Sequence, residues 1–168
     1  MITARDLVFK WTSYAIAISV ILFLHSLLLG QVKIWGVTPF LPPILLSIIA
    51  SFENSYEGTL FGLIFGICCD LTLTAPLPCL YTLSFAISAL IASFIAKSAL
   101  QTGFLCSLVV SAVSFCIVDF FLALVLLTGR HATLIAFLFL CIRELLVSLL
   151  LLPLLYPALS FLHQRFTI

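Results

Sequence analysis

The chain has 168 residues, of which 64% are hydrophobic and 8% are charged, and its net charge is +1. A soluble domain carries about 25% charged residues, so this composition excludes an ordinary soluble fold and indicates an integral membrane protein. The sequence has no run of lysine or arginine, which leaves nucleic-acid binding without an electrostatic basis.

The apolar stretches predict an all-α protein with one domain, a compact bundle of transmembrane helices. Because a spanning helix needs about 20 apolar residues, six spans fill the chain, at about 11–29, 39–52, 56–73, 80–96, 103–127 and 133–152. The second span follows a proline-rich start and covers only about 21 Å of a bilayer core of about 30 Å. It must therefore thin the membrane, tilt little or be shielded by protein.

An even number of spans places both termini on one side of the membrane. With the N-terminus inside, Arg5, Lys10, Lys97 and Arg165 are cytoplasmic, and Lys33 and Arg130 are outside. Because cytoplasmic loops carry the excess of basic residues, this distribution favours cytoplasmic termini.

The third span carries a strip of small residues. Gly58, Gly62, Gly66 and Asp70 recur at every fourth position, so they share one face of a helix. In a bilayer, small residues let two helix backbones approach closely and pack by dispersion. The strip is interpreted as packing against another helix of the same chain, and the alternative is that part of it binds a partner protein or a ligand.

Three charged residues lie deep inside apolar stretches, namely Asp119, Arg143 and Glu144. Asp119 stands twelve residues before His131 and Arg143 stands twelve residues after it. In an antiparallel hairpin that turns at His131, both therefore reach the same depth, about 18 Å from the turn. Since each charge is costly in hydrocarbon, we expect an ion pair between Asp119 and Arg143 that faces the bundle interior.

The other two acids have less defined partners. Glu144 points about 100° away from Arg143 around its helix, so it needs another donor or a proton. Asp70 either joins this cluster or reaches the outer interface. The cluster fixes helix register, acts as a switch or docking site for a partner, or moves ions or protons; few polar residues line any one face, which disfavours transport.

Signatures of several enzyme classes are missing. The sequence contains no G-x-x-x-x-G-K-[ST], H-E-x-x-H or G-x-S-x-G motif. Ser84, Ser88 and Ser114 have no histidine or lysine companion of the kind that a serine nucleophile requires. The six cysteines form no C-x-x-C pair and are interpreted as small buried residues rather than disulfides or metal ligands. We expect a protein without catalytic residues, cofactor or metal.

The order of these features carries a family resemblance. A basic N-terminus and a first span precede a short span led by Pro42-Pro43. Glu57-Gly58-x3-Gly62-x3-Gly66-x3-Asp70-Leu71 follows, and Val118-Asp119 comes later. Over nearly the whole chain this order resembles the bacterial rod shape-determining protein family MreD. One departure is Leu77-Pro78-Cys79-Leu80, where the family usually has Leu-Gly; another is a fourth span with serine and alanine in place of frequent glycines.

The resemblance implies a six-helix bundle similar to the substrate-binding components of energy-coupling-factor vitamin transporters. It also implies a non-catalytic scaffold of cell-wall elongation in the bacterial plasma (inner) membrane, acting beside MreC, MreB, RodA and a class B penicillin-binding protein. The alternative is a vitamin-binding transporter component with the same fold. For that alternative, Ala15 and Ser19 give only a weak docking pattern, and the outer loops offer few polar or aromatic residues, mainly Trp35, Thr72 and Thr74.

Overall fold

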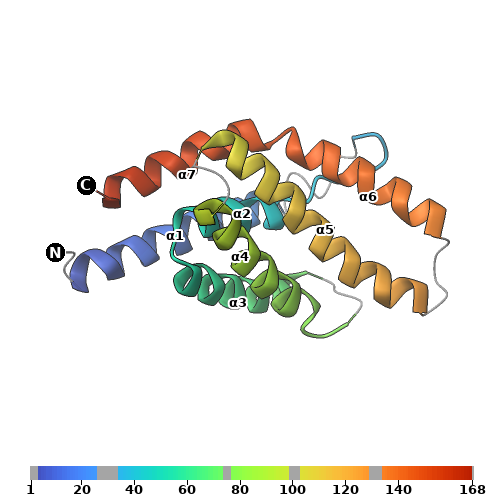
Figure 1. The fold of residues 1–168 in the computed structure, drawn as a ribbon, viewed down its shortest axis with the longest axis horizontal. Coiled ribbons are helices and arrows are strands. Elements are labelled where there is room, and N and C mark those ends of the chain that lie inside the picture. Colours follow the sequence, from blue (N-terminus) through green and yellow to red (C-terminus); the bar gives the residue numbers. More distant parts are fainter. Residues whose placement is uncertain (1–3, 26–33, 74–76, 99–102, 129–133, 168) are drawn as a thin grey trace.

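The computed structural model describes residues 4–25, 34–73, 77–98, 103–128 and 134–167 (Figure 1). The secondary structure of these residues is helical apart from turns and one isolated β-bridge between Ile34 and Val37, which confirms the expected all-α class. The helices are α1 (Ala4–Leu24), α2 (Pro42–Phe52), α3 (Ser55–Thr72), α4 (Leu80–Ser98), α5 (Phe104–Thr128), α6 (Leu134–Leu149) and α7 (Leu152–Thr167). The expected end of the first span near residue 29 and the turn at His131 lie outside the described residues.

Length and composition identify two or three membrane-spanning candidates in this part of the chain. Helices α4 and α5 are each long and apolar enough to cross a bilayer. Helices α6 and α7 together form a third candidate if the bent pair is one span, and residues 9–23 of α1 and the whole of α2 are shorter apolar helices. The architecture is therefore compatible with a helical membrane protein.

The short helix α2 lies at the centre of the bundle (Figure 1). All ten residues from Pro42 to Ser51 are buried, against α3, α4, α5 and α7. Two prolines occupy its first turn, where a missing backbone N–H is harmless. Of the three ways to accommodate so short an apolar helix, the structure shows shielding by protein.

Hydroxyl groups tie α2 to its neighbours. Ser93 of α4 donates a hydrogen bond of 2.7 Å to the carbonyl oxygen of Ala50. The Ser47 hydroxyl lies 2.6 Å from that of Ser111 on α5 and also donates to the Ile44 carbonyl. Inside an apolar bundle such bonds satisfy buried polar groups that would otherwise be costly.

The C-terminal part of the chain differs from the sequence prediction. The expected sixth span at 133–152 is α6, which ends at Leu149, and a seventh helix that we did not predict follows after a bend of 51°. Pro153 explains the break, because it has no N–H to donate to the Leu149 carbonyl and its ring would clash with that group. In the first turn of α7 the same proline is tolerated.

A column of aromatic rings starts on α1, passes through α3 and α4, and returns by way of Phe40 to His25, the residue that follows α1. Each ring centroid lies 5.6–6.1 Å from the next, a separation typical of favourable aromatic pairs. The column connects α1, α3 and α4, and it runs through Trp11, Phe61, Phe65, Phe85, Tyr81, Phe40 and His25.

Candidate functional site

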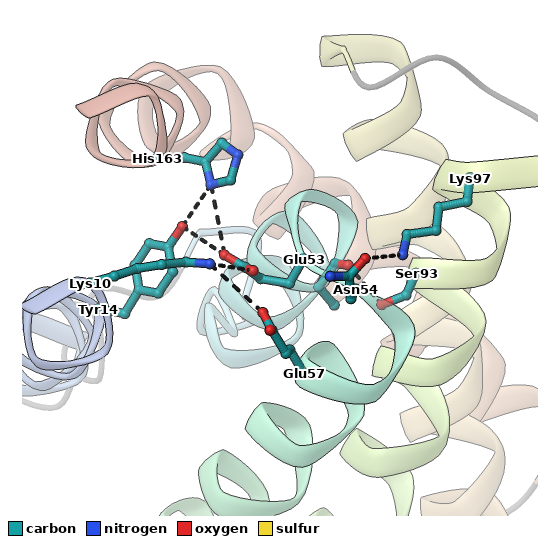
Figure 2. A network of polar contacts seen from close by, with 9 residues as sticks. Lys10, Tyr14, Glu53, Asn54, Glu57, Ser93, Lys97 and His163 are labelled. Atoms are coloured by element: carbon teal, nitrogen blue, oxygen red, sulfur yellow. Dashed lines mark hydrogen bonds and ion pairs between the residues drawn. The ribbon is translucent and has the colours of Figure 1, made fainter. Parts of the chain in front are cut away.

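A polar network occupies the end of the bundle where α1, α3 and α7 meet (Figure 2). Its centre is Glu53, which is only 4% exposed. The Lys10 ammonium lies 2.6 Å from one carboxylate oxygen of Glu53, and the Tyr14 hydroxyl donates to the other at 3.2 Å. His163 of α7 lies 3.7 Å from Glu53 and 2.9 Å from the Tyr14 hydroxyl. A buried carboxylate is stable only when it is paired and hydrogen-bonded in this way.

The chain brings these groups together through a very short connection. Glu53 is the C-cap residue of α2 and Asn54 the N-cap residue of α3, so only these two residues separate the helices. Asn54 faces the other way from Glu53 and accepts a 2.8 Å bond from Lys97 of α4 (Figure 2). The α2–α3 connection thus holds α1 and α7 on one side and α4 on the other.

Sequence reasoning missed this network. Glu53 and Asn54 fall between the predicted spans 39–52 and 56–73, and nothing in the sequence places a partner beside them. Lys10 and Tyr14, which are spaced to share one face of α1, were the available signal. The distant partner His163 has no local signal, because it is separated from Tyr14 by 149 positions in the sequence.

The glycine strip of α3 lies against α4. A methyl group on Gly62 would be 2.7 Å from the Phe85 carbonyl oxygen and from the Ala89 side chain. On Gly66 it would be 2.5 Å from the Thr82 Cα, and on Gly58 2.5 Å from the Ser93 hydroxyl. Real Cβ atoms do not approach so closely, so only glycine permits this separation of the two helices. A partner helix cannot use the same strip while α4 occupies it.

Asp70 completes the contact between α3 and α4. Its carboxylate accepts backbone hydrogen bonds from Tyr81 at 3.0 Å and from Thr82 at 2.8 Å, and a third bond from the Thr82 hydroxyl at 2.6 Å. The first N–H groups of a helix have no partner within it and carry partial positive charge, so a carboxylate there is doubly favourable. Asp70 therefore caps α4, rather than joining Asp119.

Replacing Asp70 with alanine is expected to lower the free energy of unfolding by about 2 kcal/mol, because the first turn of α4 loses its cap. Asp70→Asn retains one carbonyl oxygen as acceptor and should cost less. Thermal unfolding in detergent, followed by circular dichroism, measures both changes. An Asp70→Ala protein with unchanged stability would contradict the capping role.

The residue before α4 has an unusual backbone. Cys79 has a φ angle of +64°, a left-handed conformation that costs roughly 1–2 kcal/mol for a residue with a side chain. Its side chain is exposed. We expect Cys79→Gly to raise the free energy of unfolding by about 1 kcal/mol. Cys79→Ala, which keeps the Cβ atom, is the matched control and should change the same thermal-unfolding midpoint little.

The expected ion pair between Asp119 and Arg143 is wrong. The ion pairs among the described residues involve Lys10 or His163 with Glu53 or Glu57. Asp119 lies beside the Cys141 thiol, and Arg143 is an exposed residue of α6. The hairpin argument fixed the depth of the two residues but not the rotation of α6. Because the adjacent residues Arg143 and Glu144 point about 100° apart around α6, the sequence does not reveal which of them turns toward α5.

Glu144 and an apolar groove are the other features of the region around Asp119. Glu144 is half-buried and near enough to Asp119 and Tyr81 to interact electrostatically with both. Asp119 lies on the wall of an open groove of about 340 Å³ between α5 and α6. The groove is otherwise apolar, lined by Cys116, Phe120, Ala123, Phe137, Leu138, Cys141, Ile142 and Leu145.

The cysteines and acids form no recognisable ligand set. All six cysteines are free thiols, with three buried and three exposed. Within the described ranges, no group of three or more His, Cys, Asp or Glu side chains is arranged to hold a metal ion.

Comparison with known proteins gives no relative. No family model, curated protein or solved structure matches this chain.

Proposed function

We propose that this protein is a non-catalytic, MreD-like scaffold of the bacterial cell-wall elongation machinery. The supporting observation is that Gly58, Gly62, Gly66 and Asp70 form one structural unit with α4. These residues carry the most specific part of the resemblance. Because the carboxylate and glycines in this motif hold helices together, they fit a protein that presents a fixed surface to partners.

The backbone at Cys79, where the sequence departs from the family pattern, also supports the proposed resemblance. The family pattern usually contains glycine shortly after the acidic end of this helix, and Cys79 keeps a positive φ angle that favours glycine. The chain therefore retains a glycine-like backbone near a position where the residue type has changed.

In this proposal the chain crosses the bacterial inner membrane six times. Helices α1 to α5 each provide one crossing, and the bent pair of α6 and α7 provides the sixth. The N-terminal end of α1 and the C-terminal end of α7 lie at the same end of the bundle, as an even number of crossings requires (Figure 1). The charge distribution favours a cytoplasmic location for that end.

The proposed partners are MreC and, through the same machinery, MreB, RodA and a class B penicillin-binding protein. Since α4 occupies the glycine strip, the transmembrane helix of MreC must dock elsewhere on the bundle. The competing function, a vitamin-binding component of an energy-coupling-factor transporter, requires a tightly retained small ligand instead.

Complementation combined with native mass spectrometry tests the proposal. The gene should restore rod shape to a bacterium depleted of its own MreD, and MreC should copurify with the protein. Gly66→Leu should fail in both assays, whereas Ile64→Leu, on the exposed face of α3, should behave as wild type. Membrane levels of each variant are measured by immunoblot. Round cells with the well-expressed wild-type protein, or a retained vitamin without MreC, would overturn the proposal.

A further inference from the structure

Two opposite charges lie at matching positions on α5 and α6. Asp119 is nine residues before the end of α5 at Thr128, and Arg143 is nine residues after the start of α6 at Leu134. At 1.5 Å per residue, each lies about 14 Å from that end of its helix. In a bilayer core of about 30 Å, both charges are therefore near the midplane.

The residues around these charges keep them at that depth. The chain is wholly apolar from Phe120 to Leu127 and from Leu134 to Ile142, and most of these side chains are partly or largely exposed. Moving either charge up to the lipid headgroups would push these apolar turns into water. A lipid phosphate is therefore a poor partner for Arg143, and a charge at the midplane needs a counter-charge from protein.

The two charges face different sides of α6. Asp119 opens into the groove between α5 and α6, where Cys141 and Leu145 form the opposite wall. Arg143 is on the same helical face as Leu146, Val147 and Leu150, at i+3, i+4 and i+7. These three residues and the turn at Ile34 and Trp35 line a second apolar groove of about 360 Å³. Asp119 thus lines one apolar groove, and Arg143 shares a helix face with three residues that line the other.

We propose that a second copy of this chain docks at the groove lined by Asp119, so that Arg143 of one copy pairs with Asp119 of the next. Rotation about the membrane normal keeps every copy at the same depth and the same way up, which is what the pairing requires. Of the possible occupants of the Asp119 groove, the second copy is the one whose charge is known to be opposite and at the right depth. This inference does not depend on the proposed function.

The proposed contact is heterologous, because each copy contributes a different patch of its surface. Because Arg143 and the Asp119 groove are on opposite sides of α6, the interface joins two different patches. Such a heterologous contact generates rings when the rotation closes and open chains when it does not. The near neighbour Glu144 strengthens the case, since two acids close together in hydrocarbon favour an incoming cation.

Energy transfer between differently labelled full-length copies in liposomes tests this pairing. The labels are fused at the N-terminus, because the native thiols would react without selectivity. Arg143→Gln should weaken self-association roughly tenfold. The matched control is Arg143→Lys, which keeps a positive charge at the same position of α6. It should retain most of the self-association.

Charge exchange gives the sharper result. Asp119→Arg and Arg143→Glu should each abolish association alone, and mixing the two variants should restore it. Circular dichroism verifies that each variant is folded, and the exposed position of Arg143 keeps Arg143→Gln informative if Asp119→Arg misfolds. Wild-type copies that stay monomeric at high density would overturn the proposal in favour of a foreign helix with a basic residue. The proposal would also be overturned if the mixture of Asp119→Arg and Arg143→Glu stayed monomeric, or if a bound lipid were found in place of the second copy.

Discussion

Gly66→Leu is expected to disrupt the contact between α3 and α4 and to lower the free energy of unfolding by about 3 kcal/mol or more. The Cβ atom alone would lie within 3 Å of three backbone atoms, in Tyr81 and Thr82. Backbone cannot rotate away as a side chain can, so the two helices must separate. Separation also pulls Asp70 from the N–H groups that it caps. Steric trapping or thermal unfolding in detergent measures the loss.

The three glycines should rank by what their missing Cβ atoms would meet. At Gly66 and Gly62 backbone atoms lie within 3 Å of the added Cβ. At Gly58 only the hydroxyl of Ser93 is that close, and it can rotate away at the cost of its bond to Ala50. Gly66→Ala and Gly62→Ala should therefore destabilise more than Gly58→Ala. The control Ile64→Ala changes an exposed residue of the same helix and should cost less than any of them. Equal losses at all four positions would show that the close approach is not what matters.

The sequence was informative where a pattern was local. The spacing of Gly58, Gly62, Gly66 and Asp70 placed them on one helix face, and the structure places all four against α4. The pattern could not identify α4 as the neighbour, because any helix with small residues would serve. Nor could it show that Asp70 caps a helix that begins ten residues later at Leu80.

Helix rotation and long-range pairing were beyond the reach of the sequence. The shared depth of Asp119 and Arg143 follows from chain length alone. Arg143 and its neighbour Glu144 point about 100° apart on α6, and the sequence does not show which of them faces α5. The burial of α2 on every side depends on four other helices. Pro153 could have signalled the break before α7, because a proline inside a helical pattern ends or kinks the helix.

The second large loss of stability is expected when Glu53, the centre of the polar network, is replaced. Glu53→Ala should lower the free energy of unfolding by about 3–5 kcal/mol, because it leaves Lys10 with much weaker compensation in a mostly buried position. It also removes the acceptor of the Tyr14 bond and the carboxylate beside His163, and so loosens both α1 and α7. Thermal unfolding in detergent at neutral pH provides the measurement.

Glu57 supplies the matched control for this prediction. Its carboxylate lies 3.8 Å from the same ammonium group, but its side chain is 33% exposed against 4% for Glu53. Exposed ion pairs contribute about 1 kcal/mol or less, so Glu57→Ala should have a small effect. The double variant Glu53→Ala with Lys10→Met should cost less than the sum of the two single changes, because Lys10→Met removes the charge that Glu53→Ala leaves poorly compensated. Equal losses from the two glutamates, or strict additivity of the pair, would mean that burial of Glu53 is not what ties α1 and α7 to the centre of the bundle.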